Sequence, residues 1–244
     1  MAEKNTLVSD QLTGKVYLIR HAQSRYNQAS YELESTGKKS EIRGLKWQAQ
    51  YIDTELSEFG EMQAQLAIPM AHLLNIKTVF VSPLRRALRT AQILFEDHPA
   101  QPRIVVHPQL AEKLKNAPDV SVYRGQPFTQ YGKFDWSLFD SSYFLFDIVK
   151  NPITTTLSKF PIEEIPVKLL QAMEFMQPDK IETADDMYKR AQESKDLWKN
   201  YSLDGNVALV AHSNFFKFFT MKFPSGEKVY RWMANCEILD SDEV

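Results

Sequence analysis

Three short runs of aliphatic and β-branched residues constrain the fold of this chain most strongly. They span residues 16–19, 78–81 and 207–211, and the first and third lead into His21 and His212. Such runs are typical of strands that are buried on both faces of a parallel sheet. We therefore predict that the three strands lie parallel in one sheet. Their carboxyl ends would then share the edge at which open α/β sheets bind ligands.

Helical patterns separate the predicted strands. Ser57 is predicted to be the N-cap of a helix whose first turn is acidic, and Pro69 inside this helix is expected to kink it. The apolar positions that follow at helical spacing are Met62, Leu66, Met70, Leu73 and Leu74. Spacing of this kind is typical of an amphipathic helix.

Two further helix starts and one further strand are predicted. Ser82 is expected to be the N-cap of a helix with Pro83 in its first turn, and Thr183 with Asp186 forms a capping pattern. Residues 103–107 read as another short buried strand. Strands that alternate with helices predict an α/β fold, with a mainly parallel sheet flanked by helices on both faces.

The length of 244 residues allows one large domain or two small ones. We predict a single domain over residues 1–244, with residues 1–14 as a flexible lead-in. Residues 113–166 are rich in proline and aromatic residues. We interpret them as an insertion that caps one end of the sheet.

Composition excludes several classes of function. A net charge of −2, from 29 basic and 31 acidic residues, argues against nucleic acid as the main partner. Cys236 is the only cysteine, so no intrachain disulfide can form. No apolar run reaches the ~18 residues of a membrane span, and we expect a cytoplasmic protein without membrane contact. The sequence gives no indication of the oligomeric state.

Known cofactor patterns are also missing from the sequence. No spacing of histidine, cysteine or acidic residues matches a metal site, and no glycine-rich nucleotide fingerprint is present. We therefore predict a protein that needs neither a metal ion nor an organic cofactor.

The polar residues at the strand ends form a candidate phosphate site. A single histidine at a strand end is most often structural, but His21 and His212 occupy two matching positions. Arg20 would offer a planar charged group to phosphate oxygens, and Ser24 and Asn27 follow within the next turn. A neutral imidazole nitrogen can attack phosphorus when a carbonyl or carboxylate holds its other N–H.

Arginines and a glutamate near the other strand ends could complete this site. Arg85, Arg86 and Arg89 lie on one predicted helix, and their positions favour Arg85 or Arg86 over Arg89. Glu112 follows the strand at 103–107 and could protonate a leaving oxygen, although an exposed glutamate is the simpler interpretation of the residue alone.

Five motifs in order resemble the histidine phosphatase superfamily, which has the phosphoglycerate mutase-like fold. Residues 20–27 read Arg-His-Ala-Gln-Ser-Arg-Tyr-Asn and resemble its Arg-His-Gly-x-Ser-x-x-Asn signature. The other similar segments are residues 53–64, residues 82–91 with Ser-Pro-Leu-x-Arg-Ala-x-x-Thr-Ala, Leu110-x-Glu112, and Val210-Ala211-His212-Ser213.

The resemblance implies a role for each of these positions. His21 would become phosphohistidine, and Glu112 would be the proton donor. The residues expected to hold the phosphoryl group or the substrate are Arg20, Arg86, His212, Asn27, Ser24 and Ser213. The family resemblance also implies a small phosphorylated substrate and no metal.

Departures from the family pattern bear on the reaction. Ala22 replaces the usual glycine, and Lys113-Leu114-Lys115-Asn116 follows Glu112 where mutases resemble Glu-Arg-His-Tyr-Gly. A phosphomonoester hydrolase that uses a phosphohistidine is therefore the prediction. The alternatives are a phosphoglycerate mutase or sugar bisphosphatase with the same residues, and an inactive member that binds a phosphorylated ligand or a protein.

Overall fold

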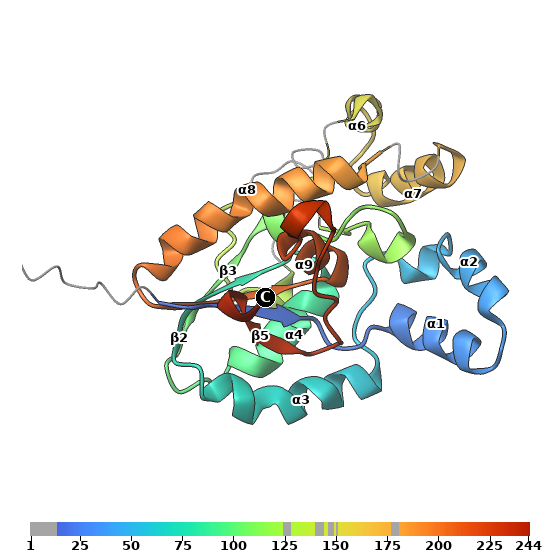
Figure 1. Ribbon diagram of the computed structural model, residues 1–244. Helices are drawn as coiled ribbons and strands as arrows, with labels where there is room; N and C mark the ends of the chain where they lie inside the picture. Colours follow the sequence, from blue (N-terminus) through green and yellow to red (C-terminus); the bar gives the residue numbers. More distant parts are fainter. Residues whose placement is uncertain (1–13, 124–127, 140–143, 146–148, 150, 177–180) are drawn as a thin grey trace, which may run out of the picture.

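A five-stranded sheet forms the centre of the computed structural model, which describes residues 14–123, 128–139, 144–145, 149, 151–176 and 181–244 (Figure 1). The strands are β1 (Val16–Arg20), β2 (Ile76–Val81), β3 (Arg103–Val106), β4 (Asn206–Ala211) and β5 (Ile238–Asp240), in the order β3-β2-β4-β1-β5. The first four run parallel and β5 runs antiparallel to β1. The predicted parallel sheet is confirmed, whereas β5 is too short to give a sequence pattern.

The strand register brings the predicted site to one edge of the sheet. Arg20 at the end of β1 lies opposite Ala211 at the end of β4, so His21 and His212 are the next residues on adjacent strands. On the other side of β4, Val81 of β2 lies opposite Val210. The carboxyl ends of three parallel strands therefore meet at this edge.

Helices cover both faces of the sheet, as the sequence predicts. Helices α3 (Glu58–His72) and α4 (Arg85–Phe95) lie on one face, and α8 (Ala184–Ser202) and α9 (Ser213–Phe219) on the other (Figure 1). The remaining described helices are α1 (Arg25–Ser35), α2 (Ile42–Leu45), α6 (Pro152–Leu157) and α7 (Ile165–Met176). Short 3₁₀ helices span Lys39–Glu41, Ala49–Tyr51, Pro108–Leu110, Ala117–Asp119, Thr129–Tyr131, Pro224–Gly226 and Ser241–Glu243. None of the helices in these ranges has the length and apolar character needed to cross a bilayer.

Two of the three helix starts agree with the sequence, and one differs. Ser57 accepts a hydrogen bond from the N–H of Gly60, and Thr183 forms a reciprocal capping box with Asp186, as predicted. Helix α4 instead begins at Arg85, and its N-cap Leu84 makes no side-chain cap. The prediction that Ser82 caps this helix is therefore wrong.

The reason lies in two long-range contacts. The hydroxyl of Ser82 contacts a ring nitrogen of His212 at 2.6 Å, so it serves the strand ends rather than the helix. The carboxylate of Asp53 accepts a hydrogen bond of 2.9 Å from the N–H of Arg85 and supplies the missing cap from another loop.

Helix α3 packs against α4 through small residues. The buried positions on α3 are Gly60, Ala64 and Ala71. The helix continues through Pro69 to His72. Of the apolar residues at helical spacing, Met62, Leu66, Met70 and Leu73 are exposed on the opposite side, whereas Leu74 lies beyond the end of the helix and packs against the core.

The described part of residues 113–166 packs onto the sheet. The rings of Tyr123 and Trp136 stack at 5.1 Å inside the same buried cluster as Val79 and Val106. Asp135 pairs with β3, because the N–H of Val106 donates to its carbonyl oxygen at 2.9 Å. This pairing covers an edge strand. Residues 124–127, 140–143, 146–148 and 150, like residues 1–13 of the expected lead-in, lie outside the described part of the chain.

Candidate active site

The two histidines that the sequence singled out lie side by side. The ring centroids of His21 and His212 are 5.0 Å apart with an angle of 57° between the planes. Both side chains are buried. Residues 191 positions apart therefore form one site, because β1 and β4 are adjacent in the sheet.

Hydrogen bonds fix the tautomer of His21. Its Nδ1 lies 2.7 Å from the carbonyl oxygen of Ala22, and its Nε2 lies 3.2 Å from Nε of Arg86. A carbonyl only accepts and a guanidinium only donates, so Nδ1 carries the hydrogen and Nε2 carries the lone pair. Burial, helped by the charges of Arg86 and Arg20, holds the pKa of His21 well below its usual value. The imidazole is therefore neutral, with a lone pair on Nε2.

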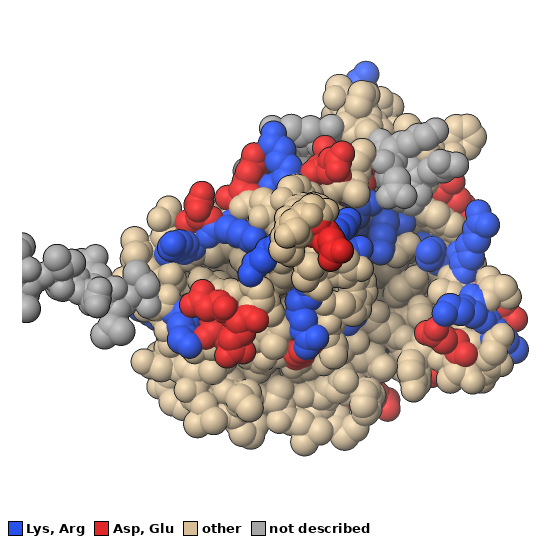
Figure 2. Space-filling view, viewed as in Figure 1, with Lys and Arg blue, Asp and Glu red and all other residues tan. Residues whose placement is uncertain are grey.

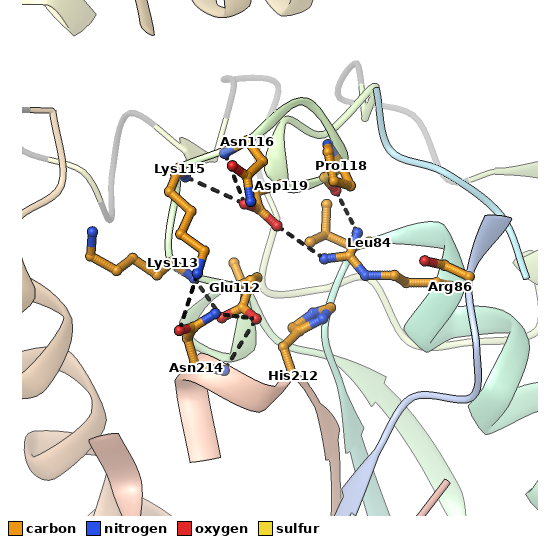
Figure 3. Close-up of polar contacts among 12 residues, drawn as sticks. Leu84, Arg86, Glu112, Lys113, Lys115, Asn116, Pro118, Asp119, His212 and Asn214 are labelled. Atoms are coloured by element: carbon orange, nitrogen blue, oxygen red, sulfur yellow. Dashed lines mark hydrogen bonds and ion pairs between the residues drawn. The ribbon is translucent and has the colours of Figure 1, made fainter. Parts of the chain in front are cut away.

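Arg86 is the arginine of helix α4 that reaches this site. Its Nη1 donates to the carbonyl oxygen of Pro118, and its Nη2 lies 3.3 Å from the carboxylate of Asp119 (Figure 3). Arg85 turns away to Asp53 and Glu55.

The sequence positions left both Arg85 and Arg86 as candidates, and the geometry selects Arg86. Arg89 is also excluded, because it binds Glu61 at 2.7 Å.

Asp119 is a site residue that the sequence did not reveal. Its carboxylate accepts a hydrogen bond of 3.0 Å from the N–H of Asn116 and forms a buried ion pair with Arg86. Burial raises the pKa of Asp119 to about 7, and the charge of Arg86 opposes this rise. The loop that holds Arg86 therefore contains a carboxyl group that titrates near neutrality.

Arg20 and His212 each keep one nitrogen without a partner among the described residues. Nη1 of Arg20 donates to the carbonyl oxygen of Met233 at 2.7 Å, while its buried Nε is unpaired. His212 contacts the hydroxyl of Ser82 through Nε2, and its buried Nδ1 is unpaired. Burial lowers the pKa of Arg20 to about 10 and moves the pKa of His212 well below its usual value. Buried nitrogens without partners are uncommon and are suited to a polar ligand.

Glu112 lies at the N-terminus of helix α9. Its carboxylate accepts hydrogen bonds from the N–H groups of Lys113 at 2.8 Å, Asn214 at 3.2 Å and Phe215 at 3.2 Å. The side-chain amide of Asn214 donates a fourth bond at 3.1 Å (Figure 3). A helix N-terminus attracts a negative charge. The same contacts fix the carboxyl group in direction, at the rim of the pocket that holds His21.

Seven of the eight predicted residues, all except His212, line one pocket of about 190 Å³. They are Arg20, His21, Ser24, Asn27, Arg86, Glu112 and Ser213. The residues of its wall that the sequence did not reveal are Tyr26, Lys115, Asn116, Pro118, Asp119, Asn214 and Trp232. Ser24 and Asn27 also form the capping box of α1, so helix α1 holds both at the pocket. Within the described ranges, no group of three His, Cys, Asp or Glu side chains is placed to hold a metal ion.

Two distant segments position the site. Near the C-terminus, Asn235 donates from its side-chain amide to the carbonyl oxygen of His21 at 3.0 Å. On α8, Arg190 donates to the carbonyl oxygen of Ala111 at 2.8 Å and pairs with the buried Glu182 at 2.6 Å. These contacts hold the backbone beside His21 and beside Glu112. No local sequence pattern marks them, because each joins segments far apart along the chain.

Comparison with known proteins gives one family and several relatives. Residues 16–116 match the model of the histidine phosphatase superfamily (branch 1). Over 104 residues the chain is 32% identical to "Fructose-2,6-bisphosphatase TIGAR B" of Danio rerio. That match covers 42% of this chain and 35% of the relative, so the chain spans about a third of the length of the curated relative that it matches.

Solved structures of low identity also align over most of the chain. The alpha-ribazole phosphatase of Shigella flexneri has a TM-score of 0.46 at 16% identity and covers 83% of this chain and 76% of its own. The phosphoglycerate mutase of Bacillus anthracis has a TM-score of 0.46 at 15% identity, and the alignment covers 91% of this chain and 93% of the mutase. The phosphoserine phosphatase of Entamoeba histolytica has a TM-score of 0.43 at 17% identity, and the alignment covers 89% of this chain and 94% of the phosphatase.

Proposed function

We propose that this chain hydrolyses phosphate monoesters through a phosphohistidine on His21. The premise is the match of residues 16–116 to the histidine phosphatase superfamily (branch 1). One observation carries the proposal. The N–H of Nδ1 is held by Ala22, and the lone pair of Nε2 points to Arg86 in a pocket of about 190 Å³. A nucleophile needs this arrangement, in which the reacting atom is free of hydrogen and the opposite nitrogen is held.

The first step transfers the phosphoryl group to the enzyme. Nε2 of His21 attacks phosphorus, the bond from phosphorus to the ester oxygen breaks, and a protonated Glu112 gives its proton to the leaving oxygen. The phosphoimidazolium keeps its Nδ1 hydrogen on the carbonyl of Ala22, so His21 releases no proton.

The second step returns the enzyme to its starting state. The carboxylate of Glu112 takes a proton from a water molecule, whose oxygen attacks phosphorus as the bond to Nε2 breaks. Inorganic phosphate leaves, and His21 is again neutral. The proton that Glu112 gave in the first step is thereby recovered.

The cationic groups stabilise the charge that spreads over the phosphoryl oxygens during transfer. Nε of Arg86, which donates to Nε2 of His21 in the free pocket, would turn to a phosphoryl oxygen when substrate binds. Nε of Arg20 and Nδ1 of His212 are the buried nitrogens that can serve the other oxygens. Asn27 accepts two bonds from Ser24 through Oδ1, so its Nδ2 group remains as a further donor.

The test compares two buried histidines, one inside the site and one outside it. His21→Gln should lower the rate of p-nitrophenyl phosphate hydrolysis by at least about a thousandfold, since a missing nucleophile has that effect. His107→Gln is the matched control, because His107 lies outside the pocket wall, and it should keep the rate. Rapid acid-free quenching should trap a phosphoryl group on wild-type His21, and excess chelator should leave the rate unchanged.

Three results would contradict this reading. A chain that binds phosphate without hydrolysing any ester would be an inactive binding member. Transfer of phosphate between positions of one sugar would make it a mutase. A trapped phosphoryl group on another side chain would remove His21 as the nucleophile.

A sugar bisphosphatase is the second candidate, because of the similarity to the fructose-2,6-bisphosphatase of Danio rerio. Lys115 lines the pocket and contacts Asn214 at 3.4 Å, so it could receive a second anionic group. Lys115→Met should then lower kcat/KM for fructose 2,6-bisphosphate roughly tenfold or more, the scale of one hydrogen bond to a charged group. In Lys115→Met the hydrolysis of p-nitrophenyl phosphate should change little. Lys133→Met, at an exposed lysine outside the pocket, is the control and should leave both rates unchanged. Equal losses on both substrates would contradict this candidate.

A further inference from the structure

Helix α3 turns its large apolar side chains away from the core. Its outward residues are Phe59, Met62, Leu66, Met70 and Leu73, whose exposed fractions are 50%, 48%, 76%, 56% and 79%. The buried residues of the helix are glycine and alanine, and the half-buried Ile68 also packs against the core. An apolar stripe at helical spacing normally marks the side that packs on the core, so here the usual arrangement is inverted. We call these five residues the α3 stripe.

The part of α3 beyond its first turn is uncharged. Residues 62–76 contain no lysine, arginine, aspartate or glutamate. Figure 2 shows mostly uncharged side chains across the lower part of the molecule, where Figure 1 places α3, with acidic atoms only towards its right-hand edge. Monomeric proteins rarely expose apolar patches larger than a few hundred Å², and larger ones mark interaction sites. Five large side chains that are each about half exposed or more form a patch of that kind.

The spacing within the stripe is symmetric about Leu66. Met62 and Met70 each lie four positions from Leu66, and Phe59 and Leu73 each lie seven positions from it. If a second α3 crosses antiparallel with a two-fold axis at Leu66, this leucine meets its own copy. Met62 then meets Met70, and Phe59 meets Leu73. An isologous interface requires such a self-complementary surface.

Charge favours the same antiparallel arrangement. Glu58 is in the first turn of α3, whereas Lys77, which follows shortly after its last turn, pairs with Asp204 at 2.5 Å. Antiparallel copies keep the two Glu58 side chains at opposite ends of the interface, whereas parallel copies would set Glu58 against Glu58. Antiparallel helix dipoles add to the preference.

We propose that the α3 stripe is the interface of a homodimer in which two α3 helices cross antiparallel at Leu66. A standard interface buries about 800 Å² on each partner around an apolar centre, and the five exposed side chains of the α3 stripe would supply that centre. The pairing of Asp135 with β3 covers the strand at that edge of the sheet, so strand addition there is blocked.

The first test introduces a charge at the two-fold axis. Wild-type protein should sediment at twice the 28.2 kDa of the chain, and Leu66→Glu should sediment as a monomer, because the two glutamates would face each other in an apolar interface. Phe175→Glu is the matched control, since Phe175 is 91% exposed on helix α7, and it should stay dimeric.

The second test uses cross-linking to locate the axis, in a Cys236→Ser background that removes the natural thiol. Leu66→Cys should form a disulfide-linked dimer on mild oxidation, because two residues at the axis come within disulfide reach. Met62→Cys and Met70→Cys should cross-link poorly alone and well when the two variants are mixed.

The outcomes separate the alternatives. A wild-type protein that sediments as a monomer overturns the proposal. If that monomer binds phosphatidylcholine vesicles in a manner that Leu66→Glu abolishes, the stripe serves a lipid surface instead. A dimer that persists in the Leu66→Glu variant would overturn the two-fold axis at Leu66. So would more efficient cross-linking of Met62→Cys alone than of Leu66→Cys or of the mixed variants. None of these results depends on the phosphatase activity.

Discussion

At the scale of single residues, the pocket depends on partners that fix direction as well as on charged groups. Ala22 fixes the tautomer of His21, and Asp119 with Pro118 fixes the guanidinium of Arg86. Because burial raises the pKa of Asp119 to about 7, its charge changes within the physiological range. Above that pH the carboxylate pairs with Arg86, and below it the protonated group holds Arg86 less strongly.

This gives a prediction for a positioning residue. With Asp119→Asn, kcat/KM for p-nitrophenyl phosphate should fall roughly tenfold at pH 8, the lower end of the effect of supporting groups. The fall in wild-type kcat/KM as pH drops through about 7 should disappear in the variant, since the titrating group is gone. Asp135→Asn, which breaks a surface pair with Arg103, is the control. A variant that keeps the acid limb would show that another group titrates there.

The sequence predicted the residues that follow strands and missed those that act across the fold. Arg20, His21 and His212 were found because each ends a buried run, and the local chain alone places them. Asp119 and Asn235 follow no run or period. Their importance comes from contacts with residues more than 30 positions away, which spacing cannot show.

At the scale of elements, the loop after β1 rests directly on helix α3. A Cβ at Gly60 would lie 2.0 Å from the carbonyl oxygen of Gln23, which is closer than atoms can approach. Ser57 of the same helix start contacts this carbonyl at 3.2 Å. Since Gln23 lies between His21 and Ser24, the position of the helix sets the position of the loop that carries His21.

Substitution at Gly60 should therefore disturb the site from outside the pocket. Gly60→Ala should lower kcat about ten- to a hundredfold, because small displacements of reacting groups have effects of that size. It should also lower the free energy of unfolding in urea. Gly44→Ala is the control, since a Cβ there meets no atom within 4 Å, and it should be neutral or stabilise the chain by up to about 1 kcal/mol. Equal kcat values for both variants would contradict this coupling.

Elements with a strong local pattern were predicted well, and those without one were not. The parallel strands and the capping box of α8 were readable from the sequence. Strand β5 has three residues, and helix α4 takes its cap from Asp53 in another loop. The spacing of the α3 stripe could not show whether these residues pack on the core of the same chain or face outward. The same helical period describes an inner face and an interface with another copy.

At the scale of the whole molecule, the fold keeps several histidines neutral. Burial lowers the pKa of His107 to about 4 and moves the pKa values of His21 and His212 well below the usual range. The unfolded chain binds protons at these positions below about pH 6.5, whereas the folded chain does not. Stability is therefore lost as pH falls through 6.5. Asp119, with its raised pKa, acts in the opposite direction between about pH 7 and 4.

The contribution of His107 can be measured separately, because it lies outside the pocket wall and packs against Trp198 with ring centroids 4.8 Å apart. Between pH 7 and pH 5 the wild-type chain should lose about 2 kcal/mol from this group alone. His107→Gln should lose correspondingly less over the same interval, as measured by urea unfolding at both pH values. An equal loss in the variant and the wild type would show that His107 is not a source of the acid sensitivity.

The sheet order has a consequence for synthesis on the ribosome. Strand β1 precedes the other described strands in the sequence, yet its neighbours on both sides are β4 and β5, the last two of the described strands. The nascent polypeptide therefore carries an unpaired apolar segment until translation has passed Asp240. Apolar strands that stay exposed and unpaired during folding are typical targets of chaperones. The pocket around His21 is therefore complete only after β4 and β5 have paired with β1.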